Sequence, residues 1–235
     1  MSKYKLKKRI ALLIIVITFI ITVFFGNLSL AKKNTDLFND ILIVTDSATT
    51  EYGITSTFNT KNNDEDIANY ILKDFGFSRN FDKKELKDGK GYSIEFGDNY
   101  LKGYIETIKY EDYNVVTVNI VKKDSKNNLE DLKNKLQKCL EYEKIDAKYF
   151  EYLKAKSTNA NIEEINNQVL ALLKDHRSAN INTIGLENGY STVAYTKNYD
   201  SIQSDNKIID FNYAVCKYPS GSYVIIGTPE LIVTY

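Results

Sequence analysis

The feature that most constrains the fold is a series of secondary-structure patterns that occurs twice along the chain. A helix pattern, a strand pattern, a second helix pattern and three strand patterns follow one another over about residues 35–123, and the same order returns over about 127–218. Few residues are identical between the two series, so the repetition is one of pattern. Runs of antiparallel strands with helices packed on one face are typical of the α+β class. We therefore predict an α+β fold in which residues 32–124 and 125–235 form two similar helix–strand–helix–three-strand repeats with antiparallel sheets.

Two helices are predicted in the first series from the spacing of apolar residues. In residues 35–48 the apolar side chains recur at helical spacing, at Leu37, Ile41, Val44 and Ala48. The second helix is predicted to begin after the cap Asn63 and to stop at Gly76. The other predicted elements are a strand over 49–59, a polar loop over 78–90, and strands over 92–96, 101–110 and 113–123.

The second series repeats this order. Asn127-x-x-Glu130 resembles a capping box before a helix with one apolar stripe, and Asn161-x-x-Glu164 opens the next helix. A strand is predicted between these helices, over 147–156. Further strands are predicted over 180–186, 190–197, 207–218 and 223–227. The dipeptide Asn188-Gly189 predicts a type I′ turn in the first of these hairpins.

The chain ends in an apolar, strand-rich segment, YPSGSYVIIGTPELIVTY, which holds both prolines of the protein. Pro219-Ser220-Gly221-Ser222 has the composition of a turn. Pro229 cannot donate a hydrogen bond to a sheet ladder, so it belongs at an edge or at a break in a strand. We predict that this segment completes the second repeat and that LIVTY continues past Pro229 along a sheet edge.

The N-terminal segment has the features of an export signal. Five cations and no acids precede the uncharged run 10–25, and Ser29-Leu30-Ala31 places small residues at the positions that signal peptidase requires. We predict cleavage after Ala31. The alternative is an uncleaved anchor over residues 10–31, because about 20 apolar residues span a bilayer. In both cases the rest of the chain is extracytoplasmic, either secreted or held at the outer face of the membrane.

The charge of the exported part disfavours nucleic acid as a partner. Residues 32–235 hold 26 Lys and Arg against 31 Asp and Glu, and only Arg79 and Arg177 are arginines. Phosphate contacts from Lys and Arg dominate affinity for nucleic acids, and an acidic, arginine-poor domain is poorly suited to them. We predict no nucleic-acid partner, and membrane contact only through residues 10–31.

The sequence contains two cysteines, Cys139 and Cys216, which are enough for one disulfide in an oxidising compartment. Each falls on an apolar face of its predicted element, and free cysteine is among the most buried residue types. We favour two buried thiols over a disulfide.

No catalytic, cofactor-binding or metal-binding motif emerges from the sequence. Two groups of neighbouring acids, Asp64-Glu65-Asp66 and Glu163-Glu164, could serve glycoside hydrolysis. Both groups fall in the first turn of a predicted helix, where the helix dipole favours acids, and this interpretation is preferred. We predict no catalytic residue, no cofactor and no metal ligand, with hydrolysis of wall polymer through a carboxylate pair as the alternative.

Three further features receive structural interpretations. His176, the single histidine, lies in the last turn of a helix, where the dipole favours a partly charged imidazole. Asp74-Phe75-Gly76 matches the metal-binding triplet of protein kinases, but its glycine stands where the helix must stop and no glycine-rich loop accompanies it. Several tyrosines are concentrated in the strands of the second series, where aromatic residues fit a half-buried pleated surface, at Tyr190, Tyr195, Tyr213, Tyr218 and Tyr223.

Three stretches carry a resemblance to a known family: DILIVTDSATTEYGITSTF, INTIGLENGYSTVAYTKNY and YAVCKYPSGSYVIIGTPELIVTY. Together with the signal-like start, they resemble the YwmB family of exported proteins from low-GC Gram-positive bacteria, over essentially the whole chain after residue 31. The resemblance implies an envelope protein, with a role around the envelope of spore formers, and it carries over no catalytic residues. The family is often labelled TATA-box-binding-like, which implies a two-repeat α+β shape but not DNA binding in an acidic exported chain.

These observations predict a non-enzymatic binding or scaffold protein at the cell envelope, with an envelope protein or a wall component as its partner. Wall-polymer hydrolysis is the first alternative, and DNA binding is the second.

Overall fold

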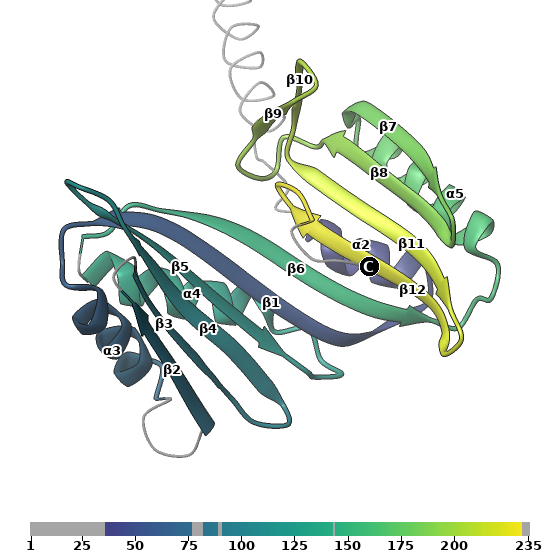
Figure 1. Ribbon diagram of the computed structural model, residues 1–235. Helices are drawn as coiled ribbons and strands as arrows, with labels where there is room; N and C mark the ends of the chain where they lie inside the picture. Colours follow the sequence, from purple (N-terminus) through teal and green to yellow (C-terminus); the bar gives the residue numbers. More distant parts are fainter. Residues whose placement is uncertain (1–35, 77–81, 89–90, 143, 232–235) are drawn as a thin grey trace, which may run out of the picture. The chain divides into compact units, whose positions relative to one another are not determined.

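The protein is α+β, with one large antiparallel sheet (Figure 1). The computed structural model describes residues 36–76, 82–88, 91–142 and 144–231. Contacts divide the chain into Met1–Asp36 and Leu37–Tyr235, and the description concerns the second unit. Ten strands form the sheet in the order β2-β3-β4-β5-β1-β6-β12-β11-β8-β7, and β9 and β10 form a separate hairpin. Strands of both predicted repeats therefore join in one sheet, because the long strands β1 and β6 pair at its centre.

The described helices are α2 Leu37–Val44, α3 Asp64–Asp74, α4 Leu129–Tyr142 and α5 Ile162–Asp175. The strands are β1 Ser47–Thr60, β2 Asp82–Asp88, β3 Gly91–Gly97, β4 Leu101–Lys109, β5 Asn114–Lys122, β6 Ala147–Ser157, β7 Ala179–Leu186, β8 Gly189–Tyr195, β9 Ile202–Ser204, β10 Lys207–Ile209, β11 Phe211–Tyr218 and β12 Gly221–Thr228.

Two of the predicted helix caps, Asn63 and Asn161, are confirmed, and the cap predicted for the first helix at Asn34 or Thr35 lies outside the described residues. Asn63 Oδ1 accepts a hydrogen bond from the backbone N–H of Glu65, and Asn161 Oδ1 accepts from two N–H groups in the first turn of α5. Asn127 Oδ1 accepts from the N–H of Leu129, the first residue of α4, so Asn127 lies one residue before the position that the capping box assigned to it. Gly76 follows α3 with φ of 77°, a left-handed conformation that glycine adopts without steric cost. These caps satisfy N–H groups that a helix leaves without internal partners.

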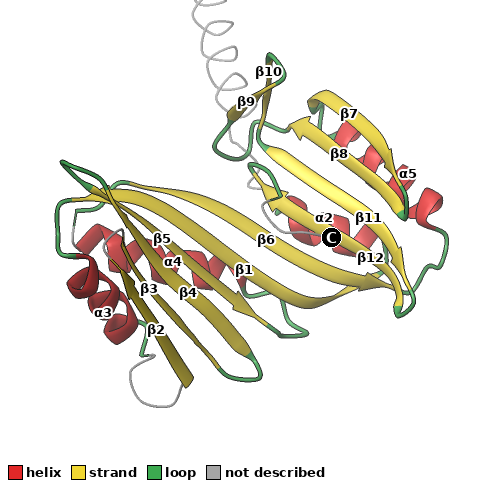
Figure 2. Cartoon of the chain, in the orientation of Figure 1, coloured by secondary structure: helices red, strands yellow, loops and turns green. Residues whose placement is uncertain are grey.

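All four described helices pack on one face of the sheet (Figure 2). Alternate residues of β1, among them Ile54 and Phe58, point toward α3 and α4, as the predicted strand alternation requires. Tyr52 and Leu153 face α2 and α5. Fully burying one large apolar side chain contributes about 1.5 to 3 kcal/mol, so these two clusters hold the helices to the sheet.

Two predicted boundaries in the first series are wrong. The first helix ends at Val44, because Asp46 takes a left-handed conformation with φ of 45° and the chain turns into β1, so Ala48 lies in a strand. The polar loop predicted over 78–90 contains β2. This strand lies at the edge of the sheet and is made almost entirely of charged residues, so it shows none of the apolar alternation from which strands are predicted.

Two predictions in the second series are also corrected. A type I′ turn requires a positive φ at both of its central residues, and neither Asn188 nor Gly189 has one. The type I′ geometry occurs instead between β9 and β10, where Asp205 and Asn206 have φ of 46° and 61°. The strand predicted over 207–218 is split at Asp210, whose buried carboxylate accepts hydrogen bonds from the backbone of residues 196, 198 and 199.

The closing segment lies inside the sheet rather than at its edge. β12 pairs with β6 on one side and β11 on the other, so it completes the sheet as predicted. The strand ends at Thr228, and the described residues beyond it fold back, with the N–H of Leu231 donating to Asn212 Oδ1. The predicted edge strand past Pro229 is therefore not formed by residues 229–231, and residues 232–235 lie outside the described part.

Both cysteines are buried free thiols, as favoured from the sequence. Within the described residues, no helix is long and apolar enough to cross a membrane. The predicted signal or anchor and its cleavage position after Ala31 lie outside the described residues.

Candidate functional site

The acid pairs considered from the sequence do not gather into a site. Glu163 and Glu164 are exposed in the first turn of α5, where their N–H groups bond to the cap Asn161. Glu65, in the first turn of α3, forms an ion pair with Lys87 at 2.7 Å. Both groups thus lie at helix N-termini, which is the interpretation preferred from the sequence.

His176 is the C-terminal cap of α5, and its Nε2 lies 3.8 Å from Asp40 Oδ2 of α2. The side chain of His176 therefore lies beside α2. Phe75 caps α3 before Gly76, so the triplet Asp74-Phe75-Gly76 is a helix stop.

The tyrosines of the second series are divided between the two faces of the sheet. Tyr213 lies under the helices, where its hydroxyl donates to Asn166 Oδ1 at 2.9 Å. Tyr218 and Tyr223 lie on the opposite face, with ring centroids 5.6 Å apart. The five residues therefore do not form one aromatic surface.

One face of the sheet packs against α2–α5, and the opposite face is here called the helix-free face. Along each strand, every second side chain points to the helices and the side chains between them point to the helix-free face. The helix-free face is the one large surface of the sheet that the described helices leave uncovered. A cross-strand row on this face links neighbouring residues on six strands from β2 to β6. The row consists of Lys84, Glu95, Tyr104, Asn119, Thr55 and Phe150.

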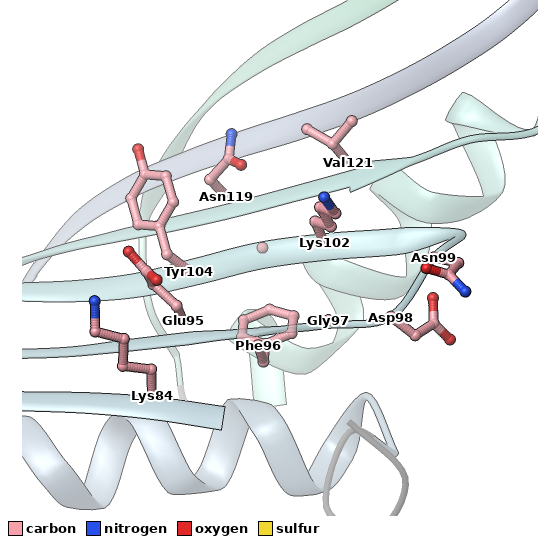
Figure 3. A pocket seen from close by; sticks show the side chains of 11 residues that line it. Lys84, Glu95, Phe96, Gly97, Asp98, Asn99, Lys102, Tyr104, Asn119 and Val121 are labelled. Atoms are coloured by element: carbon pink, nitrogen blue, oxygen red, sulfur yellow. The ribbon is translucent and has the colours of Figure 1, made fainter. Parts of the chain in front are cut away.

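A pocket of about 700 Å³ opens on the helix-free face over β3, β4 and β5 (Figure 3). Lys84, Glu95, Tyr104 and Asn119 rise into it from one side of four adjacent strands. The rest of the lining comes from Phe96, Gly97, Asp98, Asn99, Lys102, Gly103 and Val121. The Tyr104 ring, two side-chain amides, two carboxylates and two ammonium groups thereby line one concave site, hereafter the β3–β5 pocket.

Gly103 lets the strands below the pocket pack closely. A Cβ at Gly103 would lie 2.3 Å from the carbonyl oxygen of Asn119 and 2.6 Å from the ring of Phe96, which is buried under the sheet. Any side chain at this position would therefore push β4 away from its neighbours.

Local hydrogen bonds fix the polar groups around the β3–β5 pocket. Asp98 Oδ1 accepts from the N–H groups of Tyr100 and Leu101 at 2.7 and 2.8 Å, and these bonds hold the pKa of Asp98 below its usual value. Asn119 Nδ2 donates to Thr55 Oγ1 at 2.8 Å, which orients the amide. Partial burial and the nearby Glu106 carboxylate raise the pKa of Tyr104, so its phenol is protonated and can donate a hydrogen bond.

The helix-free face is closed over β6, β12 and β11. Tyr152 is only 9% exposed, and its hydroxyl donates to Glu51 Oε1 at 2.5 Å. Burial, together with this bond to Glu51, raises the pKa of Tyr152. Leu231 packs over the same cluster, which also contains Ala214, Cys216 and Ile225. Burial raises the pKa of the Cys216 thiol, which disfavours the reactive thiolate.

Lysines dominate the charge of the central part of the helix-free face. On β11, β12, β6, β1 and β5 the ionic side chains of this face are three lysines of β6 and Glu51, which is bonded to Tyr152. The lysines are Lys148, Lys154 and Lys156. Lys154 Nζ lies 5.4 and 5.2 Å from the ring centroids of Tyr218 and Tyr223, distances at which cation–π attraction operates.

The described residues contain no group of three or more His, Cys, Asp or Glu side chains that could hold a metal ion. The polar groups of the β3–β5 pocket are amides and a phenol, which can donate or accept, ammonium groups, which donate, and carboxylates, which accept; this mixture suits hydrogen bonding to a polar ligand.

A scan of the sequence against models of protein families gives no match, and a search of curated proteins finds none either.

Neither the pocket nor the cross-strand row was identified from the sequence. The row depends on the register of five strand pairs, and β2, which supplies Lys84, was predicted as a loop. A usable signal was present in β6, where AKYFEYLKAKS places lysine or an aromatic residue at every second position from Lys148 to Lys156.

Proposed function

We propose that this chain is a non-enzymatic binding protein of the cell envelope, and that its helix-free face binds an anionic glycan of the wall. The observation that carries the proposal is the charge of that face. Its five central strands present three lysines and a single carboxylate, which is already bonded, in a chain whose residues 32–235 have more acids than bases. A cationic strip on an otherwise acidic protein favours an anionic partner.

The β3–β5 pocket argues for sugar rings in that partner. Its volume of about 700 Å³ lies within the range of small-ligand sites. The Tyr104 ring offers an apolar surface beside a polar edge, and Asn119, Glu95 and the two lysines offer donors and acceptors for hydroxyl and acidic groups.

The cross-strand row extends the pocket into a path for a polymer. Five strand spacings of about 4.8 Å separate Lys84 from Phe150, so the row is roughly 24 Å long. An extended chain of several sugar units fits along it, from the pocket at β2–β5 to the aromatic ring on β6.

Nucleic acid fits the same surface less well. Recognition of a phosphate backbone relies on many Lys and Arg contacts, and residues 32–235 contain two arginines and an excess of acids. Minor-groove binding also uses apolar wedges that insert between bases, whereas Phe150 is only half-exposed in the middle of a strand.

Hydrolysis of the glycan is the alternative. Glu163 and Glu164 lie in the first turn of α5, on the helix-covered side of the sheet. They therefore do not act on a polymer bound to the helix-free face. Glu95 and Asp98 are the carboxylates that line the β3–β5 pocket, and Glu106 on β4 is the diagonal neighbour of Glu95. Release of reducing ends from the glycan, abolished by Glu95→Gln, would favour a hydrolase over a binding protein.

The proposal includes export, a two-repeat origin and membership of the YwmB family. Mirrored strand orders on the two sides of the β1–β6 pair support the repeats: β2-β3-β4-β5 on one side and β7-β8-β11-β12 on the other. N-terminal sequencing of the protein from culture medium tests the export. We expect Lys32 as the first residue, and an intact N-terminus in the membrane fraction would favour the anchor.

Binding is tested with the full-length chain in a non-ionic detergent. Isothermal titration calorimetry would compare polygalacturonate, which is an anionic glycan, with neutral dextran and with duplex DNA. We expect binding of polygalacturonate that weakens as salt rises, and no binding of dextran. Tighter binding of DNA than of polygalacturonate, or equal binding of dextran, would overturn the choice of an anionic glycan.

A further inference from the structure

The two outermost strands of the sheet have opposite chemical characters (Figure 1). β2 has the sequence DKKELKD, in which Leu86 is the one uncharged residue. β7 has the sequence ANINTIGL, which contains no charged residue. An exposed strand edge presents unpaired backbone groups to other chains, and charges on the strand are a common protection against such pairing.

The charged residues of β2 protect the first edge. Charged side chains on an edge strand, lysines above all, disfavour the approach of another strand, and six of the seven residues of β2 are charged. Desolvating so many ionic groups would oppose a strand pair at this edge.

Antiparallel pairing of β7 with a second copy of itself brings no charges together. About a two-fold axis at Ile184, Asn182 faces Leu186, Thr183 faces Gly185 and Ile184 faces its own copy. Among the described strands β7 pairs only with β8, and Ile184 is 56% exposed. A self-pair would bury this apolar side chain against an identical one.

The usable part of the edge is Asn182–Leu186. At the start of the strand the register with β8 shifts between Ala179 and Asn182, and Asn180 has φ of 53°. Asn180 Nδ2 also donates to the carbonyl oxygen of Ile208 in β10 at 2.9 Å, so the β9–β10 hairpin lies against this end. From Asn182 to Leu186 the pairing with β8 is regular, and at Gly185 no atom lies within 4 Å of an added Cβ.

We propose that β7 is a self-association edge, through which two copies of this chain join their sheets by antiparallel pairing of Asn182–Leu186. The two-fold axis runs perpendicular to the sheet, so the helix-free faces of both copies lie on the same side of one continuous sheet. A second copy is the occupant, because antiparallel self-pairing of this neutral segment buries Ile184 against its own copy and places no charges opposite one another, whereas the other edge is lined with charged residues. The proposal is independent of what the helix-free face binds.

The test measures the mass of the full-length chain in a non-ionic detergent by sedimentation equilibrium over a wide range of concentrations. We expect a monomer–dimer equilibrium for the unchanged chain. Ile184→Lys places two ammonium groups opposite each other and should leave only monomer. Leu86→Lys is the matched control, because Leu86 is 57% exposed, lies at the other edge on the same face, and should leave the dimer intact.

Cross-linking gives a second readout, because a disulfide between two copies traps the dimer covalently. Opposed Cα atoms of an antiparallel pair lie about 4.5 to 5.5 Å apart, which is within the range that a disulfide spans. Oxidised Ile184→Cys should form a covalent dimer, and oxidised Leu86→Cys should remain monomeric, since Cys139 and Cys216 are buried. A monomeric unchanged chain, or equal cross-linking of the two variants, would overturn the proposal.

Discussion

The helix-free face is open over β3–β5 and closed over β6, β12 and β11, although both regions belong to one sheet and lie on the same side of it. In the open region Tyr104 is 37% exposed and lines a pocket, whereas in the closed region Tyr152 is 9% exposed and bonded to Glu51. The difference arises from what lies above the strands. Leu231 and the Tyr218–Tyr223 pair cover the closed region, and the described residues place no equivalent cover over β3–β5.

The comparison separates two roles for tyrosine on one surface. A tyrosine in the closed region contributes to stability through burial, and a tyrosine in the open region is available to a ligand. Strand alternation assigns both residues to the same face, so neighbouring elements rather than the pattern of the strand itself decide which role each has.

The largest expected effect is on the stability of the closed region. Tyr152→Ala removes a buried ring and should lower the free energy of unfolding by about 3 to 5 kcal/mol, the range for large-to-small changes at buried aromatic residues. Tyr104→Ala should change it by no more than about 0.5 kcal/mol, as expected for an exposed position. Urea denaturation of both variants checks this, and equal losses would remove the distinction between the regions.

The dependence of stability on pH tests the burial of Tyr213, which lies on the helix-covered face of the sheet. Burial raises the pKa of Tyr213 to about 12, from 10 for an ordinary tyrosine. Because the folded state holds this proton more tightly, the contribution to stability is complete below pH 10 and is lost as pH rises from 10 to 12. Each pKa unit corresponds to about 1.4 kcal/mol, so the loss is up to about 3 kcal/mol.

Tyr213→Phe isolates this contribution. The variant also loses the hydrogen bond to Asn166, so it should be less stable than the unchanged protein at pH 8, and the difference should shrink between pH 10 and 12. Urea denaturation at each pH gives the two curves. Parallel curves over this range would show that Tyr213 does not have a raised pKa.

Gly103, in the strand below the open region, should not tolerate an added methyl group. Gly103→Ala should lower the free energy of unfolding by about 1 to 3 kcal/mol, the usual cost of overpacking, because its Cβ would overlap Phe96 and the backbone of β5. Gly185→Ala is the control, since its Cβ meets no atom within 4 Å. Thermal denaturation distinguishes them, and a Gly103→Ala variant as stable as Gly185→Ala would mean that the strands can separate at no cost.

The sequence predicted those parts of the fold that rest on local signals. The caps Asn63 and Asn161, the stop at Gly76 and the alternation in β1 are all signals within one element, and all are confirmed. β2 was missed because an edge strand held by backbone hydrogen bonds needs no apolar pattern. The split at Asp210 was missed because its carboxylate bonds to a loop more than ten residues away.

The β3–β5 pocket depends on interactions that no local signal records. It requires the register that aligns Lys84, Glu95, Tyr104 and Asn119 across four strands. The pairing of β1 with β6, which joins both series in one sheet, is likewise a long-range contact. Composition predicted an acidic chain but not the cationic strip on β6, because the sign of a surface depends on which side chains share a face.

Glycan binding by the open region is tested most directly by a pair of tyrosine variants four residues apart. Tyr104 lines the β3–β5 pocket, whereas Tyr100 is 71% exposed in the neighbouring turn and does not line it. Calorimetry with polygalacturonate should give at least about a tenfold weaker affinity for Tyr104→Ala, which is about 1.4 kcal/mol, and an unchanged affinity for Tyr100→Ala. Equal affinities of the two variants would contradict the assignment of the β3–β5 pocket as the binding site.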